Sequence, residues 1–587
     1  MRIHKFYLFV FLLLSPMLLS AQGFLHTKDK QIVNAEGSNV LLRGIGTGNW
    51  MIQEGYMMLT GSALPTQHDY QNKLIELIGV ARTDSFYNIW LDNHFSRTEL
   101  DSMKAWGFNS VRPALHYLWF TPPIEEEPVA GEITWINRGF EMVDSLMKWC
   151  AENEMYLILD MHGVPGGQGK NASISDYDPE KPSLWESEKN KDKLVALWKK
   201  LADRYKNEPW MGGYDLINET NWDFEDSGNE NGCNCQENEP LKVMFEDLID
   251  AIREVDINHI IFLEGNCWAN NYRGLKSLAS YDDNVVYSFH KYWNYNNQES
   301  INWITHLRDS LNVPIWMGEG GENSNTWFAN AVNILESNNI GWSWWPVKKT
   351  RVNNPFQVEI NDSYLQLVEY FDGKRDKPSE EEIYDAIFSW AENHKAENCS
   401  IKYDVIDALI RQPFDNTTKP FKRLTTEMPI NATDYDFGRN GHAYSDNDTG
   451  TYRTNTGHNT PWNRGMKYRN DGVDIELSND KEAAGNIYTL FSIEAGEWLQ
   501  YSVHVAGEGD YFLEVRMQAD TVPVKFQLEV NNEIIGGPFT IEPDKNIAWK
   551  SYRFENIQLT KGLLPIHIKF LQGGGKLSYF KLINSEL

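Results

Sequence analysis

Cysteine and positive charge are both scarce in this chain of 587 residues. Its five cysteines are too few and too scattered for a disulfide framework. Lys and Arg together number 54 against 83 Asp and Glu, which leaves a net charge of −29. A surface of this sign repels phosphate backbones and anionic lipids. We therefore expect neither nucleic-acid binding nor membrane insertion.

Long apolar runs are missing beyond the N-terminus. Three basic residues within positions 2–5 precede an apolar run over 6–19, which ends in Leu-Ser-Ala at 19–21. This order is that of a secretory signal peptide, and the run is short for a bilayer span. The absence of a cysteine near residue 21 disfavours a lipid anchor. We predict a signal peptide over 1–21 and a secreted or periplasmic protein, which we expect to be a monomer.

Two of the cysteines, Cys233 and Cys235, lie in an acidic insertion over 221–239. The chain offers no second Cys or His pair nearby at zinc spacing, so a metal site is disfavoured there. We predict either a local bridge between the two or two free thiols. The insertion itself is interpreted either as a wall at one end of a cleft or as a solvated loop.

Short β-rich runs alternate with helical stretches from residue 24 to residue 350. Predicted strands lie at 109–112, 155–160, 259–264, 284–289 and 313–318, and predicted helices at 139–153 and 240–255. The alternation indicates parallel strands with crossover helices. About eight such units fit a closed (β/α)8 TIM barrel. A dinucleotide-binding sheet is disfavoured, because no Gly-rich fingerprint follows the first strand.

The pattern changes twice after the predicted barrel. Charged helical stretches from about 376 predict an extension, so that the first domain spans 22–427. From 428 to 587, turn residues separate alternating strands such as 498–503 and 511–516. This second pattern predicts an all-β jelly-roll sandwich domain.

Polar residues follow the predicted barrel strands at the ends where barrel enzymes carry their catalytic groups. They are Arg112, His162, Asn218, Glu219, His290, Tyr292, Glu319 and Trp345. The two glutamates, 219 and 319, are three βα units apart at roughly 31 residues per unit, which places them on the fourth and seventh strands. Carboxylates about 5–5.5 Å apart perform retaining glycoside hydrolysis. Glu264 and Glu322 are less well placed rivals.

Several stretches, taken in order, resemble glycoside hydrolase family 5, the cellulase family. They are Leu-Arg-Gly-Ile-Gly at 42–46, Asn-Ser-Val-Arg-Pro at 109–113, 159–163, Asn-Glu at 218–219, 264–268, 290–292, 316–319, and 341–345 followed by Lys348. The resemblance implies a two-glutamate hydrolase that needs no cofactor. Thr220 departs from the Pro that the family commonly has after its acid/base residue.

The resemblance also implies a role for each of the matched residues. Glu219 would be the acid/base and Glu319 the nucleophile, with Asn218 on the sugar 2-hydroxyl. Arg112 and Tyr292 would hold Glu319 ionised, because a cation beside a carboxylate lowers its pKa. His162 and His290 would line the subsites at the cleaved bond, and Trp345 would lie beneath the sugar. For His116, Trp50, Trp268 and Trp293, sugar contact and core packing remain open.

The polymer that the barrel acts on is less directly indicated. Stretches 46–50 and 163–168 resemble members that act on β-1,3-glucans from chain ends. A C-terminal binding module is more usual in secreted enzymes that cut within chains. We predict a β-glucan hydrolase of the endo-β-1,4-glucanase, or cellulase, type. The alternatives are an exo-acting β-1,3-glucanase, a β-mannanase or xyloglucanase, and a polysaccharide-binding protein on an inactive barrel.

The second domain resembles carbohydrate-binding module family 6 at 432–436, 468–475 and 495–501. Such modules hold a sugar between two aromatic rings with an Asn nearby. Trp549 stands at one ring position, Phe491 lies beside the other, and Lys576 replaces the Asn. Asn431 and Thr433 stand where acidic ligands of a structural calcium are expected, which disfavours calcium. Sugar binding and a packed scaffold against the barrel remain open alternatives for this domain.

Overall fold

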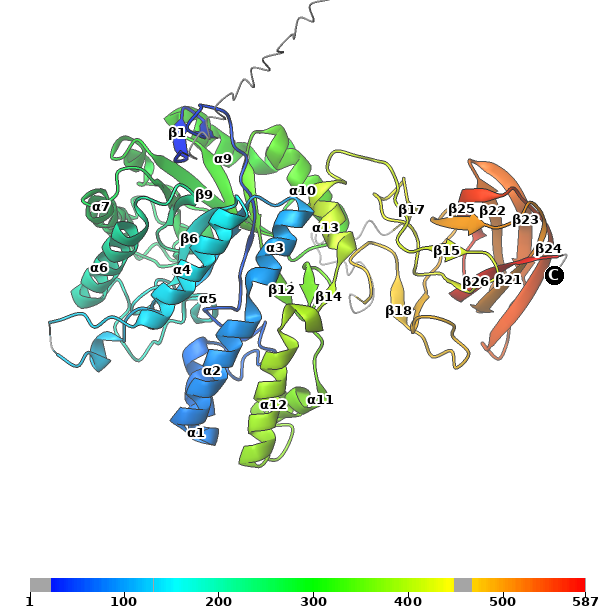
Figure 1. The fold of residues 1–587 in the computed structure, drawn as a ribbon, viewed down its shortest axis with the longest axis horizontal. Coiled ribbons are helices and arrows are strands. Elements are labelled where there is room, and N and C mark those ends of the chain that lie inside the picture. The colour runs from blue at the N-terminus through cyan, green and yellow to red at the C-terminus, as the bar shows by residue number, and fades with distance from the viewer. Residues whose placement is uncertain (1–22, 130, 448–466, 586–587) are drawn as a thin grey trace, which may run out of the picture.

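The computed structural model describes residues 23–129, 131–447 and 467–585. It consists of a helix-covered barrel, a helical extension and a β-sandwich, arranged along the long axis of the molecule (Figure 1). The predicted signal peptide over 1–21 lies outside the described residues. None of the described helices is both long enough and apolar enough to cross a bilayer.

The barrel is a closed sheet of parallel strands, which confirms the predicted fold. Its strands are β3 (Arg43–Gly46), β4 (Ser110–Arg112), β5 (Ala114–His116), β6 (Tyr156–Gly163), β7 (Met211–Asp215), β8 (Ile260–Glu264), β9 (Val285–Lys291), β10 (Ile315–Gly320) and β11 (Gly341–Trp344). β4 and β5 both pair with β6 and are the two halves of the second strand, interrupted at Pro113. Proline has no N–H to donate to the ladder.

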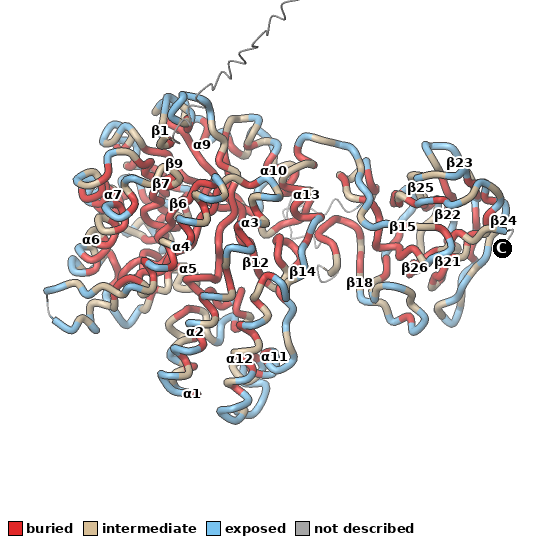
Figure 2. Tube along the Cα trace, viewed as in Figure 1, coloured by how far each residue is buried: buried red, intermediate tan, exposed pale blue. Residues whose placement is uncertain are grey.

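Helices surround the barrel and bury their apolar faces against it. They are α1 (Gln67–Ile78), α2 (Val80–His94), α3 (Arg97–Trp106), α4 (Asn137–Glu152), α6 (Glu188–Tyr205), α7 (Glu239–Arg253), α9 (Gln298–Leu311) and α10 (Asn325–Ser337). Side-chain caps begin several of them: Ser96 opens α3 with a capping box to Glu99. The barrel strands are buried throughout (Figure 2).

Three helices and a small sheet form the extension after the barrel. They are α11 (Asp362–Phe371), α12 (Glu380–Asn393), α13 (Tyr403–Ile410), and the strands β12 (Lys348–Lys349), β13 (Phe356–Gln357) and β14 (Ser400–Ile401). α12 packs against α1 and α2, whereas α13 packs against α10. The extension therefore belongs to the barrel's core and also reaches the helix that follows β10.

The C-terminal region is a sandwich of two sheets with its own apolar core. One sheet contains β15 (Leu424–Thr425), β17 (Tyr444–Ser445), β20 (Trp498–Val505), β22 (Val524–Val530), β23 (Glu533–Ile541) and β25 (Gly562–Gln572). The other contains β16 (Ile430–Asn431), β18 (Ile475–Leu477), β19 (Tyr488–Leu490), β21 (Gly509–Gln518), β24 (Trp549–Leu559) and β26 (Lys576–Asn584). Nearly all pairings are antiparallel, as the alternating sequence pattern predicts.

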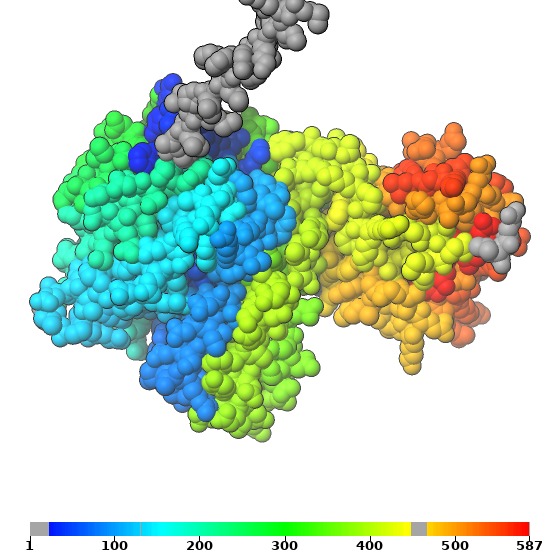
Figure 3. All heavy atoms as spheres, viewed as in Figure 1, coloured from blue at the N-terminus to red at the C-terminus, as the bar shows by residue number. Residues whose placement is uncertain are grey.

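The sandwich is in contact with the barrel rather than held at a distance by a linker. In the space-filling view the yellow residues between the two parts join them without an opening on the face shown (Figure 3). Hydrogen bonds cross this contact, among them one from Arg439 of the sandwich region to Asn330 of α10, at 2.5 Å. The two domains therefore share a built interface.

Candidate active site

A cavity of about 1050 Å³ opens at the carboxyl ends of the barrel strands. Predicted residues that line it are His162, Glu219, Trp268, His290, Tyr292, Trp293, Glu319 and Trp345. Further lining residues that the sequence reasoning did not select include Glu54, Tyr56, Ile174, Asn270, Lys291, Tyr295, Glu322 and Arg351. Residues distant in sequence thus converge at the end of the barrel where catalytic groups are expected.

The two predicted glutamates face each other in this cavity. Glu219 follows the fourth barrel strand, β7, and Glu319 lies on the seventh, β10. One carboxylate oxygen of Glu219, one of Glu319 and a ring nitrogen of His290 all lie within 4.8 Å of one another. Both glutamates are buried, with 6% and 4% of their surface exposed. Carboxyl groups about 5–5.5 Å apart are typical of retaining glycosidases, whereas those of inverting enzymes are about 6.5–9.5 Å apart.

The backbone of Glu219 is held in an unusual conformation. Its φ is 42°, in the left-handed region that non-glycine residues rarely occupy. The Glu219 N–H donates to Glu264 Oε2 at 2.7 Å, and Glu219 Oε1 lies 2.5 Å from His290 Nδ1. These contacts hold both the backbone and the carboxyl group of Glu219 in place. Glu264, a rival in the sequence analysis, is therefore a support for Glu219.

Arg112 lies beneath the cavity and is fully buried. Its Nη1 donates to Glu319 Oε1 at 2.6 Å, and its Nη2 donates to Asn218 Oδ1 at 2.9 Å and to Glu264 Oε1 at 2.8 Å. Its Nε donates to Asp215 Oδ2 at 2.9 Å. The planar fork of a guanidinium can satisfy several acceptors in this way, which a lysine ammonium cannot.

The environment keeps Glu319 ionised. Burial would raise the pKa of its carboxyl, but the charges of His290, Arg112 and His162 and a hydrogen bond from Tyr292 lower that pKa to about 2. The Tyr292 hydroxyl donates to Glu319 Oε2 at 2.8 Å. An ionised carboxylate at this position is suited to act as a nucleophile.

His162 and Trp345 form one side of the cavity. Their rings stack with centroids 5.1 Å apart and an interplanar angle of 3°. His162 Nδ1 lies 2.8 Å from Asp160 Oδ2, and the pKa of His162 rises to about 9 because Asp160, Glu319 and Glu54 outweigh the effect of burial. Trp345 lies so close to Gly46 and Gly48 that a Cβ at either glycine would come within 2.8 Å of its ring. The Gly-Thr-Gly stretch at 46–48 is thus explained by the position of this tryptophan.

Glu54 is a functional candidate that the sequence analysis missed. It lies between predicted motifs, four residues after Trp50, and lines the cavity. Burial raises the pKa of Glu54 to about 8, with Glu319, Glu322 and Glu219 adding to this rise and His162 opposing it. At neutral pH the Glu54 carboxyl is therefore protonated and able to donate a hydrogen bond to a sugar oxygen. The one sequence feature that could have indicated Glu54 is its position shortly after the stretch 42–46, which resembles family 5.

A set of hydrogen-bonded polar side chains, here called the polar partition, lines the cavity beside Trp345. The Trp345 Nε1–H donates to the Tyr56 hydroxyl at 3.1 Å, and that hydroxyl donates to Glu322 Oε1 at 3.0 Å. Lys349 Nζ donates to the same Glu322 oxygen at 2.5 Å. The partition links the loop after β3 with the loops after β10 and β11. Glu322, the other rival glutamate, belongs to this partition.

The predicted pairing of the cysteines is wrong. Cys233 forms a disulfide with Cys267, 34 residues away, while Cys235 is free and buried. No sequence signal in 264–268 indicated this partner, because the bridge depends on how the acidic insertion folds back over the turn after β8. Among the described residues that line the cavity, none belongs to 221–239. The insertion therefore supports the cavity from behind.

The disulfide anchors the turn that carries Trp268. Cys267, Trp268 and Ala269 all have φ between 54° and 60°, a left-handed turn that costs roughly 1–2 kcal/mol per non-glycine residue. The Trp268 N–H donates to Thr220 O at 3.1 Å, which ties the turn to the residue after Glu219. Trp268 lines the cavity, so its predicted contact with sugar stays a prediction that its position allows.

Other predicted contacts have different outcomes. His116 is buried with its Nε2 3.0 Å from Asp176 Oδ2 and does not line the cavity. Trp50 donates from its indole N–H to Leu91 O within the core. These two residues are packing residues, and the prediction that His116 contacts substrate is wrong. Trp293, by contrast, lines the cavity and is 51% exposed.

The predicted binding residues of the sandwich differ in how far they are exposed to solvent. Trp549 is partly exposed, and its indole N–H donates to Asn479 Oδ1 at 2.7 Å. Phe491 is buried, with 7% of its surface exposed. A buried ring cannot stack on a polysaccharide, so the predicted role of Phe491 is wrong. Lys576, at the expected Asn position, forms an ion pair with Glu476.

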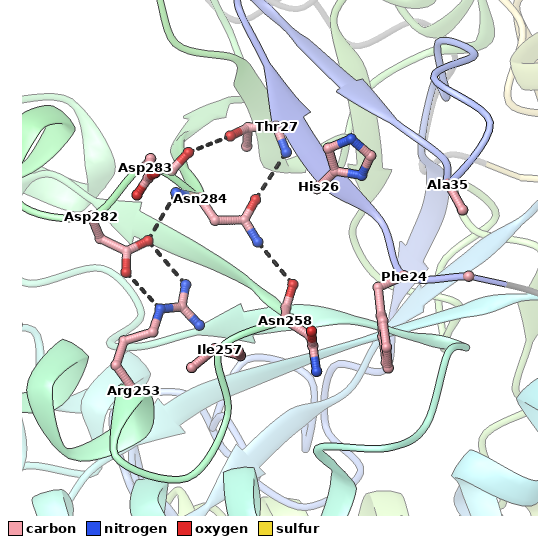
Figure 4. Close-up of a pocket in the computed structure, with 11 residues that line it drawn as sticks. Phe24, His26, Thr27, Ala35, Arg253, Ile257, Asn258, Asp282, Asp283 and Asn284 are labelled. Atoms are coloured by element: carbon pink, nitrogen blue, oxygen red, sulfur yellow. Dashed lines mark hydrogen bonds and ion pairs between the residues drawn. The ribbon is translucent and has the colours of Figure 1, made fainter.

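A second hollow of about 730 Å³ lies at the opposite end of the barrel, before β8 and β9. The polar side chains around it are engaged with one another (Figure 4). Arg253 pairs with Asp282 at 2.5 Å, and Asn284 accepts from the Thr27 N–H and donates to Asn258 O, both at 2.9 Å. Contacts at this end of a barrel stabilise the fold, because barrel enzymes carry their catalytic groups at the opposite end.

The cavity contains two groups of side chains whose spacing would suit a metal ion. They are Asp160, His162 and Glu319, and Glu219, His290 and Glu319. In both groups the histidine ring already contacts a carboxylate. Burial would lower the pKa of His290, but the negative charges of Glu264, Glu319 and Glu219 raise it well above its ordinary value. A protonated histidine cannot ligate a metal, so these donor sets fit the charge network better than an ion.

Comparison with known proteins identifies the class of both domains. Residues 69–350 match the family model "Cellulase (glycosyl hydrolase family 5)", and residues 469–582 match "Carbohydrate binding module (family 35)". The barrel is therefore a glycoside hydrolase domain of family 5. The resemblance of the sandwich to a carbohydrate-binding module is confirmed, but its family is 35 rather than the related family 6.

Individual relatives match less than half of this chain. A β-xylosidase of Phanerodontia chrysosporium is 26% identical over 270 residues, covering 46% of this chain and 52% of that protein. Endoglucanase C of Acetivibrio thermocellus is 29% identical over 219 residues, covering 35% of this chain and 54% of that protein. The chain thus spans about half the length of these relatives. A solved endogalactoceramidase is 15% identical with a TM-score of 0.42, covering 95% of this chain and 100% of that one.

The disulfide predicts a specific effect on Trp268. Replacing Cys267 with Ser should release the left-handed turn, lower the free energy of unfolding by about 2–4 kcal/mol and raise KM severalfold. Denaturant unfolding and steady-state kinetics measure the two effects. Cys235→Ser is the matched control, because Cys235 is a free thiol in the same insertion. Equal effects of both variants would contradict a role for the disulfide in holding Trp268.

Glu54 predicts a pH dependence of sugar binding. As the pH rises through about 8, Glu54 loses its proton, which removes a donor and adds a negative charge to the cavity. Oligosaccharide Kd should therefore rise above pH 8 in the wild type and change less in Glu54→Gln. Calorimetric titration between pH 6 and pH 9 measures this difference. The same alkaline weakening in Glu54→Gln would assign it to another group, such as His162.

Proposed function

We propose that this protein is a secreted retaining glycoside hydrolase that cleaves β-glucan, in the manner of an endo-β-1,4-glucanase. The observation that carries this proposal is the approach of Glu219 and Glu319 carboxylate oxygens to within 4.8 Å in a cavity at the mouth of the barrel. Carboxyl groups this close are characteristic of a double displacement through a covalent intermediate.

The roles of the two glutamates follow from their surroundings. Glu319, with a pKa lowered to about 2, attacks the anomeric carbon and forms a glycosyl ester as the bond to the leaving oxygen breaks. Glu219, across the cavity, gives its proton to that oxygen. Water then attacks the anomeric carbon, Glu219 takes a proton from it, and Glu319 leaves. Two inversions restore the original configuration.

Cationic side chains around Glu319 supply the positive charge that a metal ion could otherwise provide there. Arg112 and the raised pKa values of His162 and His290 place positive charge around Glu319. We propose that the reaction needs no metal. In the sandwich, Lys422 Nζ lies 3.1 Å from both carboxylate oxygens of Asp434, beside Asn431 and Thr433. A cation already occupies this position, which disfavours a structural calcium there.

The aromatic residues at the cavity mouth support a polymeric substrate. Trp268, Trp293 and Tyr295 line it, and the last two are about half exposed, at 51% and 49%. Flat exposed rings stack on sugar faces, which favours several consecutive sugar subsites. The family 35 module supports binding of the same polymer, with Trp549 as its exposed ring. Export through the predicted signal peptide would bring the enzyme to such a substrate.

A second candidate is hydrolysis from chain ends, as in exo-acting β-1,3-glucanases. The polar partition of Tyr56, Glu322 and Lys349 beside Trp345 favours this alternative, because it lines one side of the cavity. A closed side would allow only a few sugar units beyond the cleaved bond.

A panel of polymers tests the function and the mode of attack. The full chain should release products from β-1,4-glucan or mixed-linkage glucan at the same rate with and without EDTA. Chromatography should show a ladder of oligomers for internal attack, or one small product for attack at chain ends. Products from mannan or xyloglucan alone would contradict the β-glucan proposal but not the mechanism. An inactive wild type on every polymer would contradict hydrolysis of these substrates.

Azide distinguishes the two glutamates. Glu219→Ala and Glu319→Ala should each lower kcat on the natural polymer by at least roughly 10²-fold. With an activated aryl β-glycoside and azide, Glu219→Ala should give the β-glycosyl azide, because azide attacks the covalent intermediate. Glu319→Ala should give the α-glycosyl azide by direct displacement. NMR of the products identifies the anomers, and the reverse pattern would exchange the assigned roles.

A further inference from the structure

A buried polar network joins the sandwich to the loop after β10. Asn470 of the binding module donates from Nδ2 to Asn323 O at 2.9 Å and to Asn325 Oδ1 at 3.0 Å. Its carbonyl accepts from the Asn325 N–H at 2.9 Å, and its own N–H donates to Asp404 Oδ2 of α13 at 2.8 Å. Asp471 Oδ1 accepts from Asn325 Nδ2 at 2.9 Å. All five residues are at most 3% exposed.

The module holds its side of this network firmly. Asp471 Oδ2 lies 2.8 Å from Arg469 Nη2 and accepts from the Tyr435 hydroxyl at 3.0 Å. The Arg469 guanidinium lies over the Tyr435 ring, 3.8 Å from its centroid. All three residues are buried, and Arg469 and Asp471 belong to the stretch 468–475 at the start of the part that matches the binding module. This stretch therefore serves as the module's docking loop, which the proposed function does not use.

The loop that Asn470 holds leads directly to the nucleophile. Asn323 donates from Nδ2 to the carbonyl of Tyr292 at 3.1 Å. The Tyr292 hydroxyl donates to Glu319 Oε2 at 2.8 Å. Asn470 thus holds the backbone of Asn323, the Asn323 side chain holds the backbone of Tyr292, and the Tyr292 hydroxyl reaches Glu319. The same loop begins at Gly321 and Glu322, which line the cavity.

We propose that Asn470 of the C-terminal module is a positioning residue for the hydrolytic site, acting through Asn323 and Tyr292. The module then completes the support of Glu319 in addition to any polymer binding. A buried network of this kind has a single well-satisfied arrangement, because each group that loses its partner bears the cost of an unmade hydrogen bond. The catalytic readout of this proposal rests on the proposed hydrolase function.

A double-mutant cycle tests whether Asn470 acts through Tyr292. In the full chain, Asn470→Ala should lower kcat about tenfold on a small aryl β-glycoside, roughly the worth of one hydrogen bond, with KM changed less than about twofold. The glycoside is too small to need polymer binding by the module. In the Tyr292→Phe background, Asn470→Ala should have little further effect, since coupled residues are not additive.

Gln500→Ala is the matched control for loss of a buried amide in the module. Gln500 Nε2 donates to Thr418 Oγ1 at 2.8 Å and to Asp436 Oδ2 at 2.9 Å, away from the loop after β10. This variant should lose stability without the selective fall in kcat. An equal fall in Gln500→Ala, or an additive loss in the Tyr292→Phe background, would overturn the proposal.

Hydrogen exchange provides a readout that needs no activity. Peptides covering 286–296 and 319–328 should exchange about tenfold faster in Asn470→Ala than in the wild type, and not in Gln500→Ala. Asn323→Ala, on the barrel side, should reproduce the effect on 286–296 if Asn470→Ala fails to fold. Unchanged exchange in both variants would overturn the positioning role. Faster exchange in an enzyme inactive on every tested glycan would overturn the proposed function alone.

Discussion

The buried guanidinium of Arg112 is the interaction on which the rest of the site depends. It donates to Glu319 of β10, to Glu264 of β8, and to Asp215 and Asn218 at the end of β7 and just after it. Without this charge, burying so many carboxylates at one place would be strongly unfavourable. Arg112 also explains the division of labour, because it keeps Glu319 ionised while Glu264 is free to hold the backbone of Glu219. Glu219 and Glu319 are thus positioned by Arg112 and Glu264, which do not line the cavity.

The walls of the cavity depend on support from loops behind them. Trp345 rests on two glycines, and Trp268 is carried by a left-handed turn that the Cys233–Cys267 disulfide and Thr220 hold in place. Glu54 and the partition beside Trp345 add polar contacts on the other side. The walls of the cavity thus come from long loops, whereas Glu219 and Glu319 lie at or just after the ends of barrel strands. This separation is the general advantage of the barrel, in which loops vary on a constant frame.

The sandwich packs on the barrel through buried polar contacts, unlike a binding module that is joined only by a flexible linker. Its docking loop meets α10 and α13 through buried polar contacts, and these contacts extend to the loop after the nucleophile. The sandwich fold agrees with the match to a family 35 module. Within it, Phe491 is buried and Lys576 forms an ion pair with Glu476. The proposed positioning role uses Asn470, which is buried against the barrel, whereas the proposed polymer-binding role uses Trp549, which is partly exposed.

Much of this architecture was predictable from the sequence, for identifiable reasons. The strand–helix alternation indicated the barrel, and the turn-rich alternating pattern indicated the sandwich, because apolar periodicity is local. The glutamates 219 and 319 could be placed on the fourth and seventh strands because each follows an apolar run at regular spacing. By contrast, Glu54 lies in an irregular loop, and the partner of Cys233 lies across such a loop. The burial of His116 and Phe491 also depends on neighbours distant in sequence.

The sequence by itself therefore determined the domain order, the barrel and sandwich classes, and the two carboxylates with most of their supporting set, since these follow from local patterns at strand ends. Only the tertiary structure decided the Cys233–Cys267 bridge, the raised pKa of Glu54, the partition beside Trp345 and the docking of Asn470 onto Asn323. Each of these depends on loops from different parts of the chain meeting in space. Their contacts arise from close packing and burial, which no local pattern encodes.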